Sequence, residues 1–216
     1  YISNPIAIKK NRYLTRVFIS IRNKNNQSSV AFFDIDNTNY NLCGRLRLLI
    51  KIEDHKSSFF RDGIGLGDIY KSGENYIFGF MAWQQNDRKH WTGEIGTFKL
   101  SKNLNDVIEI FKKPQLSIGI KDPVSLSYPG YLKQGNKIHI WYGSTIDWNA
   151  GNGEMHHVIK HAIISNNSRI CYDGQCILSS LKNKQNYLNK IFDNKRYMYS
   201  LIGILIFLSV FLAIIL

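Results

Sequence analysis

Cysteine is scarce in this sequence. The 216 residues include three cysteines, Cys43, Cys171 and Cys176, and no two of them form a CxxC pair. CxxC pairs are typical of structural zinc sites, and a disulfide framework uses cysteines in even numbers. We therefore expect no metal site and no disulfide framework, and the pattern favours a reducing compartment. We also expect no cofactor.

Blocks of like charge are missing from most of the chain. Lysine and arginine number 28 against 16 aspartates and glutamates, which gives a formal net charge of +12. A nucleic-acid-binding protein gathers such charge to neutralise phosphates, whereas here the basic residues are spread along the chain until its last part. The charge pattern indicates a solvated surface plus a cluster beside a membrane. We expect no nucleic-acid partner.

Two motifs that suggest a cofactor or a metal lack a necessary part. The segment GIGLGD at 63–68 does not have the GxGxxG spacing of a phosphate loop. We interpret it as a strand whose glycines permit close packing at a crowded channel. On a strand, His157 and His161 share one face and His156 lies on the other. No carboxylate is spaced to complete a metal site with these histidines.

The same order of strands and turns recurs along the chain. Asp122–Ser144 has a carboxylate, an apolar strand, a glycine-containing turn and an aromatic strand, and Asp62–Ala82 has the same order. Ser3–Ser20 is an earlier copy of the strand pair. A period of roughly 60 residues, in which every unit consists of short strands, is typical of a β-propeller with one blade per repeat. We predict an all-β fold.

The predicted strands divide among about three blades. In the first blade we expect strands at 3–9, 14–22, 28–36 and 46–52. In the second we expect them from Asp62, at 76–83 and at 92–100, with a turn at 101–106 that ends the blade. In the third we expect them from Asp122, at 138–143 and at 156–165, with a long loop at 145–154. A fourth blade is expected to begin at Ile170 and to remain unfinished.

The composition changes after residue 180, where the predicted propeller domain (1–180) ends. Residues 181–196 are predicted to be a basic linker, and the uncharged run Tyr197–Leu216 has about the 20 residues that cross a hydrocarbon core of roughly 30 Å. We predict a C-terminal transmembrane helix there. Since the basic residues precede it, the positive-inside rule places the propeller in the cytoplasm, on a single-pass anchor. If the tail instead results from a frameshift or an early stop, the protein is cytoplasmic without an anchor.

Three segments together resemble a known family. Val17–Asp36, Asp62–Trp83 and Asp122–Trp148 are similar to motifs of a bacterial group of five-bladed β-propeller proteins related to glycoside hydrolase families 43 and 32. Members of this group are often associated with surface-polysaccharide biosynthesis. The resemblance covers residues 1 to about 177 and implies an incomplete propeller, because five blades at this repeat length need roughly 300 residues. Either another source of blades completes the ring, or the domain is truncated at both ends.

The resemblance implies that carboxylates from successive blades converge at the mouth of the central channel. Glycoside hydrolysis needs one carboxylic acid to protonate the leaving oxygen and a carboxylate to activate water or to attack. The predicted catalytic residues are Asp62 and Asp122, each before the innermost strand of its blade, and Glu154 as a candidate general acid. The first blade has no carboxylate at 1–3. Alternatively, Asp122 caps a turn before Pro123 and Glu154 is an ordinary loop carboxylate.

Aromatic residues at strand ends suggest a surface for sugar binding. An aromatic ring packs against the apolar face of a sugar while polar groups bind its hydroxyls. Trp83 and Trp148 end their strands at loops, so we predict that they bind substrate together with Ser127. Trp141 and Tyr142 alternate in one strand, so one of the two is expected to be buried.

Three functions remain open on the sequence alone. The first is a glycoside hydrolase-like or glycosyl-transferring propeller that acts on or recognises a carbohydrate. The second is a non-catalytic glycan-binding or scaffolding module, and the third is an inactive truncated product. A carboxylate in the first blade would separate the first function from the second, and the sequence has none at the corresponding place.

Overall fold

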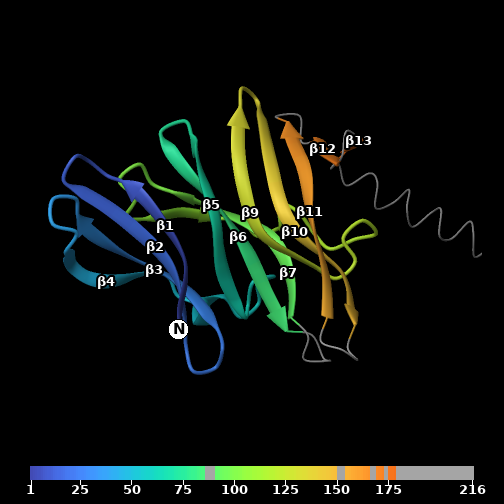
Figure 1. The fold of residues 1–216 in the computed structure, drawn as a ribbon, viewed down its shortest axis with the longest axis horizontal. Helices are drawn as coiled ribbons and strands as arrows, with labels where there is room; N and C mark the ends of the chain where they lie inside the picture. The colour runs from blue at the N-terminus through green and yellow to red at the C-terminus, as the bar shows by residue number, and fades with distance from the viewer. Residues whose placement is uncertain (86–90, 150–153, 166–168, 173–174, 179–216) are drawn as a thin grey trace, which may run out of the picture.

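The computed structural model describes residues 1–85, 91–149, 154–165, 169–172 and 175–178 (Figure 1). Within these ranges the chain consists of β-strands joined by turns and by one short 3-10 helix, η1 (Ile52–His55). The strands form three blades that follow one another from left to right in Figure 1. The prediction of an all-β, incomplete propeller is therefore confirmed.

The first blade is a meander of β1 (Ile2–Lys9), β2 (Leu14–Arg22), β3 (Ser28–Asp36) and β4 (Leu42–Ile50). Its middle strands are apolar on both faces, since Phe18 is fully buried on one face of β2 and Ile19 is buried on the other. A strand that is buried on both faces has no alternation of polar and apolar residues. In the turn before β3, the side-chain oxygen of Asn23 accepts hydrogen bonds from the N–H groups of Asn25 and Gln27 at 2.9 and 3.0 Å. Such a turn favours asparagine.

The second blade consists of β5 (Gly63–Ser72), β6 (Asn75–Gln85), β7 (Trp91–Leu100) and β8 (Val107–Ile110). The expectation that residues 101–106 end this blade is wrong. They form a hairpin turn, in which the N–H of Ser101 donates to the carbonyl of Asp106 at 2.9 Å, and the turn leads into β8. Among the described strands, a single parallel bridge between Ser28 and Gly63 joins this blade to the first.

The third blade consists of β9 (Ser125–Gln134), β10 (Lys137–Asn149), β11 (Glu154–Ser165), β12 (Arg169–Tyr172) and β13 (Gln175–Leu178). Two expectations are wrong here. Residues 145–149 continue β10 and do not belong to a loop. Ile170 lies in β12, which pairs with β11, so it extends the third blade and does not begin a fourth.

Aromatic rings pack the interface between the first and second blades. Phe18 of β2 meets Phe78 of β6 edge to face, with ring centroids 4.9 Å apart. At one edge of this apolar interface, the buried Arg16 donates to Asp34 at 2.7 Å and to the carbonyl of Leu104 at 2.7 Å. A buried guanidinium needs such partners for its donors. Arg16 therefore ties the first blade to the turn that precedes β8.

Glycines line the second blade where the third blade packs against it. A Cβ on Gly67 would overlap Pro129, and a Cβ on Gly79 would overlap the ring of Tyr131. A polar link accompanies this contact, since Oδ2 of Asp68 accepts the N–H of Tyr131 at 2.8 Å. The segment GIGLGD is thus a strand whose glycines permit close packing, as predicted from its sequence.

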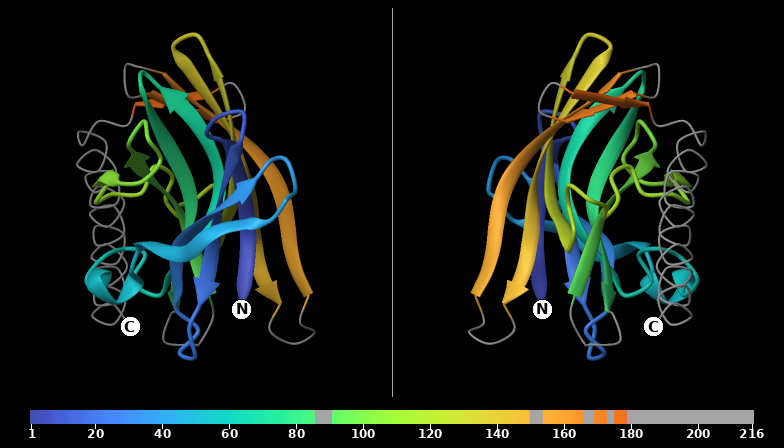
Figure 2. Two further views of the ribbon diagram at one scale, coloured as in Figure 1. Left: turned by 90° about the vertical axis from the view of Figure 1, so that its left-hand side faces the viewer. Right: turned by 90° about the vertical axis from the view of Figure 1, so that its right-hand side faces the viewer.

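The long strands of all three blades lie roughly along one common axis, and paired neighbours within a blade run in opposite directions (Figure 2). β9 points upward in Figure 1, whereas β6 points downward. The end of β6 and the beginning of β9 therefore lie at the same end of the molecule. The candidate site described below lies at this end.

Among the described residues, no helix has the length and the apolar character needed to cross a bilayer. The predicted basic linker and transmembrane helix, at 181–216, lie outside the described residues, as does the boundary at residue 180. These three expectations stay predictions.

Candidate functional site

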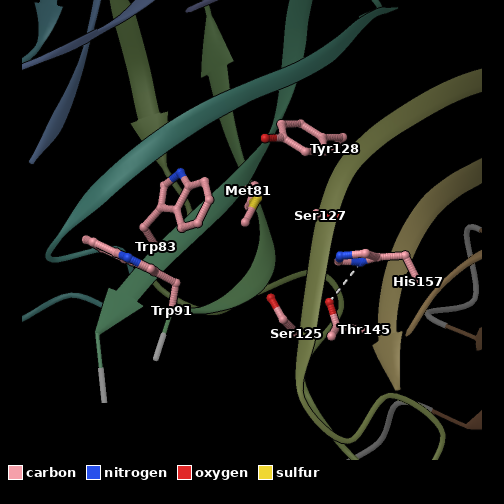
Figure 3. Close-up of a pocket in the computed structure, with 8 residues that line it drawn as sticks. All are labelled: Met81, Trp83, Trp91, Ser125, Ser127, Tyr128, Thr145 and His157. Carbon is pink, nitrogen blue, oxygen red and sulfur yellow. Dashed lines mark hydrogen bonds between the residues drawn. The ribbon is translucent and has the colours of Figure 1, made fainter. Parts of the chain in front are cut away.

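A cavity of about 280 Å³ opens between the second and third blades, where β6 ends and β9 begins (Figure 3). Its lining residues are Met81, Trp83, Trp91, Ser125, Ser127, Tyr128, Thr145 and His157. Trp83 and Ser127, both predicted to bind substrate, are therefore brought into one cavity. Met81, Tyr128, Thr145 and His157 were not predicted.

The second blade supplies an aromatic wall. Trp83, near the end of β6, and Trp91, at the start of β7, hold their rings at 86° with centroids 5.6 Å apart. Gly65 leaves space for Trp83, since a Cβ there would lie 3.0 Å from the indole Nε1. Met81 shares a face of β6 with Trp83 and extends the apolar surface.

The third blade supplies a wall of hydroxyl groups. The hydroxyl of Ser127 donates to the carbonyl of Gly143 at 3.4 Å, and a Cβ on Gly143 would lie only 2.6 Å from this hydroxyl. Thr145 Oγ1 and His157 Nδ1 are 3.1 Å apart, and Figure 3 shows this hydrogen bond as a dashed line. Its direction depends on the tautomer of the imidazole. Together with Ser125, these side chains offer donors and acceptors without a permanent charge.

Tyr128 enters the cleft from an irregular point in β9. Its backbone φ is 45° and its side chain is 57% exposed. The pairing of β9 with β10 is interrupted at Tyr128 and Pro129, since proline has no N–H to donate. β1 has a similar interruption at Asn4 and Pro5, with a φ of 54° at Asn4. Bulges change the direction of side chains. Pro129, inside an otherwise regular strand, is the sequence signal that could have identified the bulge at Tyr128.

Asp62 lies directly before β5, as predicted, and is held at the end of β6. Its N–H donates to the carbonyl of Trp83 at 3.3 Å, and its Oδ2 accepts the N–H of Gln85 at 2.9 Å. Arg61 Nε lies 3.7 Å from this carboxylate, whose side chain is partly exposed. Asp62 is thus adjacent to the aromatic wall but is not one of the lining residues.

Asp122 is buried inside the third blade, with 3% of its surface exposed. Oδ1 accepts from Lys160 Nζ at 3.0 Å, and Oδ2 accepts from the hydroxyl of Tyr142 at 3.2 Å. A buried charge requires such partners. Tyr142 is the buried member of the pair that it forms with Trp141. Asp122 does not line the cavity, and its catalytic role stays a prediction.

Glu154 and Trp148 lie on the two strands that lead toward residues 150–153. Asn149 pairs with Glu154, and Trp148 pairs with Met155. The backbone register therefore places both predicted site residues at the same end of the β10–β11 hairpin. Their side chains lie outside the described part of the chain, so their roles stay predictions.

The histidines of β10 and β11 separate into two groups. His161 Nε2 lies 3.0 Å from His139 Nδ1, and the ring of Trp141 stacks on His161 with centroids 4.7 Å apart. His157 instead contacts Thr145 in the cleft. Over the ranges that the structure describes, no group of three or more His, Cys, Asp or Glu residues is placed to hold a metal ion.

Comparison with known sequences finds distant relatives. No protein-family model matches the chain. Two uncharacterized proteins of Mycobacterium tuberculosis are each 28% identical to it over 104 residues, which is 46% of this chain and 33% of the relative. The chain therefore spans about a third of the length of these curated relatives.

Comparison with solved structures identifies the fold. The sucrose-6-phosphate hydrolase from Lactobacillus gasseri matches 80% of this chain with a TM-score of 0.60, at 10% identity and over 34% of its own length. A thermostable family-43 glycoside hydrolase matches 83% with a TM-score of 0.56, at 11% identity and over 59% of its length. The fold is that of the glycoside-hydrolase propellers. An α-L-arabinofuranosidase from Lactobacillus brevis agrees, with 78% of this chain matched at a TM-score of 0.55 and 7% identity, over 54% of its own length. The predicted relation to the propellers of families 43 and 32 is confirmed at the level of the fold.

Proposed function

We propose that the chain is part of a glycoside-hydrolase-like propeller that acts on or recognises a glycan in the cleft between its second and third blades. The observation that carries this proposal is the pairing of an aromatic wall with a hydroxyl wall in one cavity. Trp83 and Trp91 stand on one side, and Ser127 and Thr145 stand on the other (Figure 3).

The chemistry of a sugar ring supports the proposal. One face of such a ring consists of C–H groups and packs against an indole, while its hydroxyls both donate and accept hydrogen bonds. Pockets for small ligands are commonly apolar with a few placed polar groups. The cleft has this composition, and the proteins that share the fold include two whose names describe cleavage of a sugar linkage.

Hydrolysis in this cleft would require a pair of carboxyl groups, one on each side of the scissile bond. Asp62 is the proposed catalytic carboxylate, because it is partly exposed and adjacent to Trp83. Glu154 is the proposed general acid. Asp122, which the sequence also predicts to be catalytic, is buried and accepts hydrogen bonds from Lys160 and Tyr142. This buried ion pair is the observation that favours the second candidate function, glycan recognition without hydrolysis.

Binding of the full chain to a panel of immobilised plant and bacterial oligosaccharides tests the proposal. Wild type is compared with Trp83→Ala and Trp91→Ala, and with the matched control Trp141→Ala, which removes a 40% exposed tryptophan outside the cleft. We expect each cleft variant to weaken binding by about tenfold, since aromatic stacking and burial are worth on the order of 1 kcal/mol or more. Absence of binding by the wild type, or equal loss in all three variants, would contradict the proposal.

Release of reducing sugar from the same panel separates the two candidate functions. If the cleft hydrolyses its ligand, Asp62→Asn abolishes release while binding persists. If the cleft only recognises the glycan, wild type binds without release, and Asp62→Asn leaves the result unchanged.

A further inference from the structure

Among the residues that the structure describes, the lining of the cleft carries no permanent charge, although the whole protein is strongly basic. None of the eight lining residues is Lys, Arg, Asp or Glu, whereas the formal net charge is +12. Overall charge governs long-range attraction, but it does not supply a partner inside a cavity. The local composition of the cleft and the overall charge of the protein therefore favour ligands of different kinds.

Two cations of the same blades are engaged by carboxylates. Arg61 Nε lies 3.7 Å from Asp62 beside the aromatic wall, and Lys160 Nζ lies 3.0 Å from Asp122 in the third blade. A phosphate or carboxylate on the ligand would lose water in the cleft without gaining a Lys or Arg partner from the described lining residues. An uncharged hydroxyl would find both donors and acceptors there.

His157 is the most versatile polar group of the lining. Its Nδ1 is engaged by Thr145 Oγ1 at 3.1 Å, which fixes the orientation of the ring. When the Thr145 hydroxyl donates to Nδ1, the proton of the neutral imidazole is on Nε2, and this N–H becomes a donor for a sugar hydroxyl. Figure 3 shows His157 and Thr145 on the side of the cleft opposite to Trp83 and Trp91.

From these contacts we infer that the cleft selects an uncharged sugar unit over a phosphorylated or carboxylated one, and that His157, held by Thr145, binds a hydroxyl of that unit. The inference rests on the proposed glycan function and specifies its ligand. It is opposite to what the net charge alone suggests, namely an anionic polysaccharide.

The test uses matched pairs of oligosaccharides: gluco- and galacto-oligosaccharides, their uronic-acid counterparts, and their 6-phosphates. Binding to the full chain is measured at low and at physiological salt, because salt screens long-range attraction to a basic surface. At physiological salt we expect the neutral member of a pair to bind at least about tenfold more tightly, since an unpaired buried charge is costly.

Two variants examine the residues that carry the inference. Thr145→Val keeps the shape of the side chain and removes its hydroxyl, and we expect it to weaken neutral-sugar binding by about fivefold to tenfold, the size of one hydrogen bond. Tyr128→Arg adds a cation at an exposed position of the cleft, and we expect it to shift preference toward the anionic members. His55→Gln, at a residue outside the cleft lining, serves as the control.

The outcomes distinguish this inference from the function on which it rests. If the wild type binds no sugar of either series, the proposed function fails and the inference fails with it. If anionic members bind as tightly as neutral ones at physiological salt, the inference is overturned while glycan binding stands. If the wild type prefers neutral oligosaccharides and Thr145→Val binds them as tightly as the wild type does, the assigned role of His157 and Thr145 is overturned.

Discussion

The surroundings of a carboxylate decide what that carboxylate can do, and Asp62 and Asp122 show this at the scale of single residues. Both precede the innermost strand of a blade in the sequence. Asp62 is partly exposed and accepts a backbone N–H, whereas Asp122 is 3% exposed and accepts from Lys160 and Tyr142. The first is accessible to a ligand at the cleft, and the second is buried with partners on both of its oxygens.

Removal of Lys160 should destabilise the protein strongly. Lys160→Met leaves Asp122 buried without its cation, which costs about 3 kcal/mol or more in the free energy of unfolding. Chemical denaturation of the full chain measures this change. The control is Lys102→Met, since Lys102 and Glu74 form an ion pair with side chains 71% and 79% exposed, and such pairs contribute little. Equal stability of the two variants would show that Asp122 does not depend on Lys160.

Acid should weaken the contact between Asp34 and Arg16. Hydrogen bonding from the buried Arg16 lowers the pKa of Asp34 below its ordinary value of 3.8. Because the folded-state pKa is lowered, this stabilisation is present above the unfolded-state pKa and is lost as the pH falls through the folded-state pKa. We expect Asp34→Asn to be less stable than wild type at neutral pH and to lose less stability below about pH 4.

The unfolding free energy of both proteins as a function of pH measures this difference. Glu74→Gln, at an exposed ion pair, is the control and should follow the wild-type curve. Parallel curves for wild type and Asp34→Asn would contradict the role of this pair.

Sequence reasoning identified part of the cleft, and the reason is physical. Trp83 could be predicted because it ends a strand at a loop, where an aromatic ring is available to a ligand. Thr145 and His157 could not, since the predicted loop at 145–154 hid the strand pairing that brings them together. Tyr128 depends on a bulge, and a bulge is defined by the partner strand as much as by its own sequence.

Strands were predicted well where both faces are buried and poorly at the outer edges of blades. β2 and β6 contain continuous apolar residues and were placed correctly. β8 was missed because its four residues are only partly buried or exposed, which leaves little periodic pattern to read. It is recognised by its pairing with β7, a contact made through the turn at 101–106.

The contact between Gly79 and Tyr131 should be sensitive to a single methyl group. Gly79→Ala places a Cβ inside the space of the Tyr131 ring, and overpacking of this kind costs about 1–3 kcal/mol. Gly130→Ala is the matched control, because a Cβ there would have its nearest neighbour, the carbonyl oxygen of Trp141, at 3.9 Å. Thermal denaturation of the two variants compares the costs.

A second substitution tests whether the Tyr131 ring is the cause. Tyr131→Leu should recover part of the stability that Gly79→Ala loses, so that the two changes are not additive. If the stability losses of Gly79→Ala and Tyr131→Leu are fully additive, the strain of Gly79→Ala does not come from the Tyr131 ring.

At the scale of the whole molecule, the predicted membrane anchor gives a direct prediction. If 197–216 form a transmembrane helix, the full chain sediments with membranes and is released by detergent, but not by high salt. A chain that ends at residue 180 should remain in the supernatant. Release of the full chain by salt alone would show that its basic charge, and not an inserted helix, holds it at the membrane.

The two faces of the second blade differ in shape, and this difference fixes the order in which neighbouring blades can pack. One face presents the ring of Phe78 to Phe18 of the first blade, and on the other face Gly67 and Gly79 leave space for Pro129 and Tyr131 of the third blade. If this blade were duplicated in tandem, the Phe78 face of the second copy would lie against the Gly67 and Gly79 face of the first. The spaces at these two glycines fit Pro129 and Tyr131. We therefore expect a tandem copy of this blade to pack poorly against the original, so that an inserted blade needs a neighbour with a matching face.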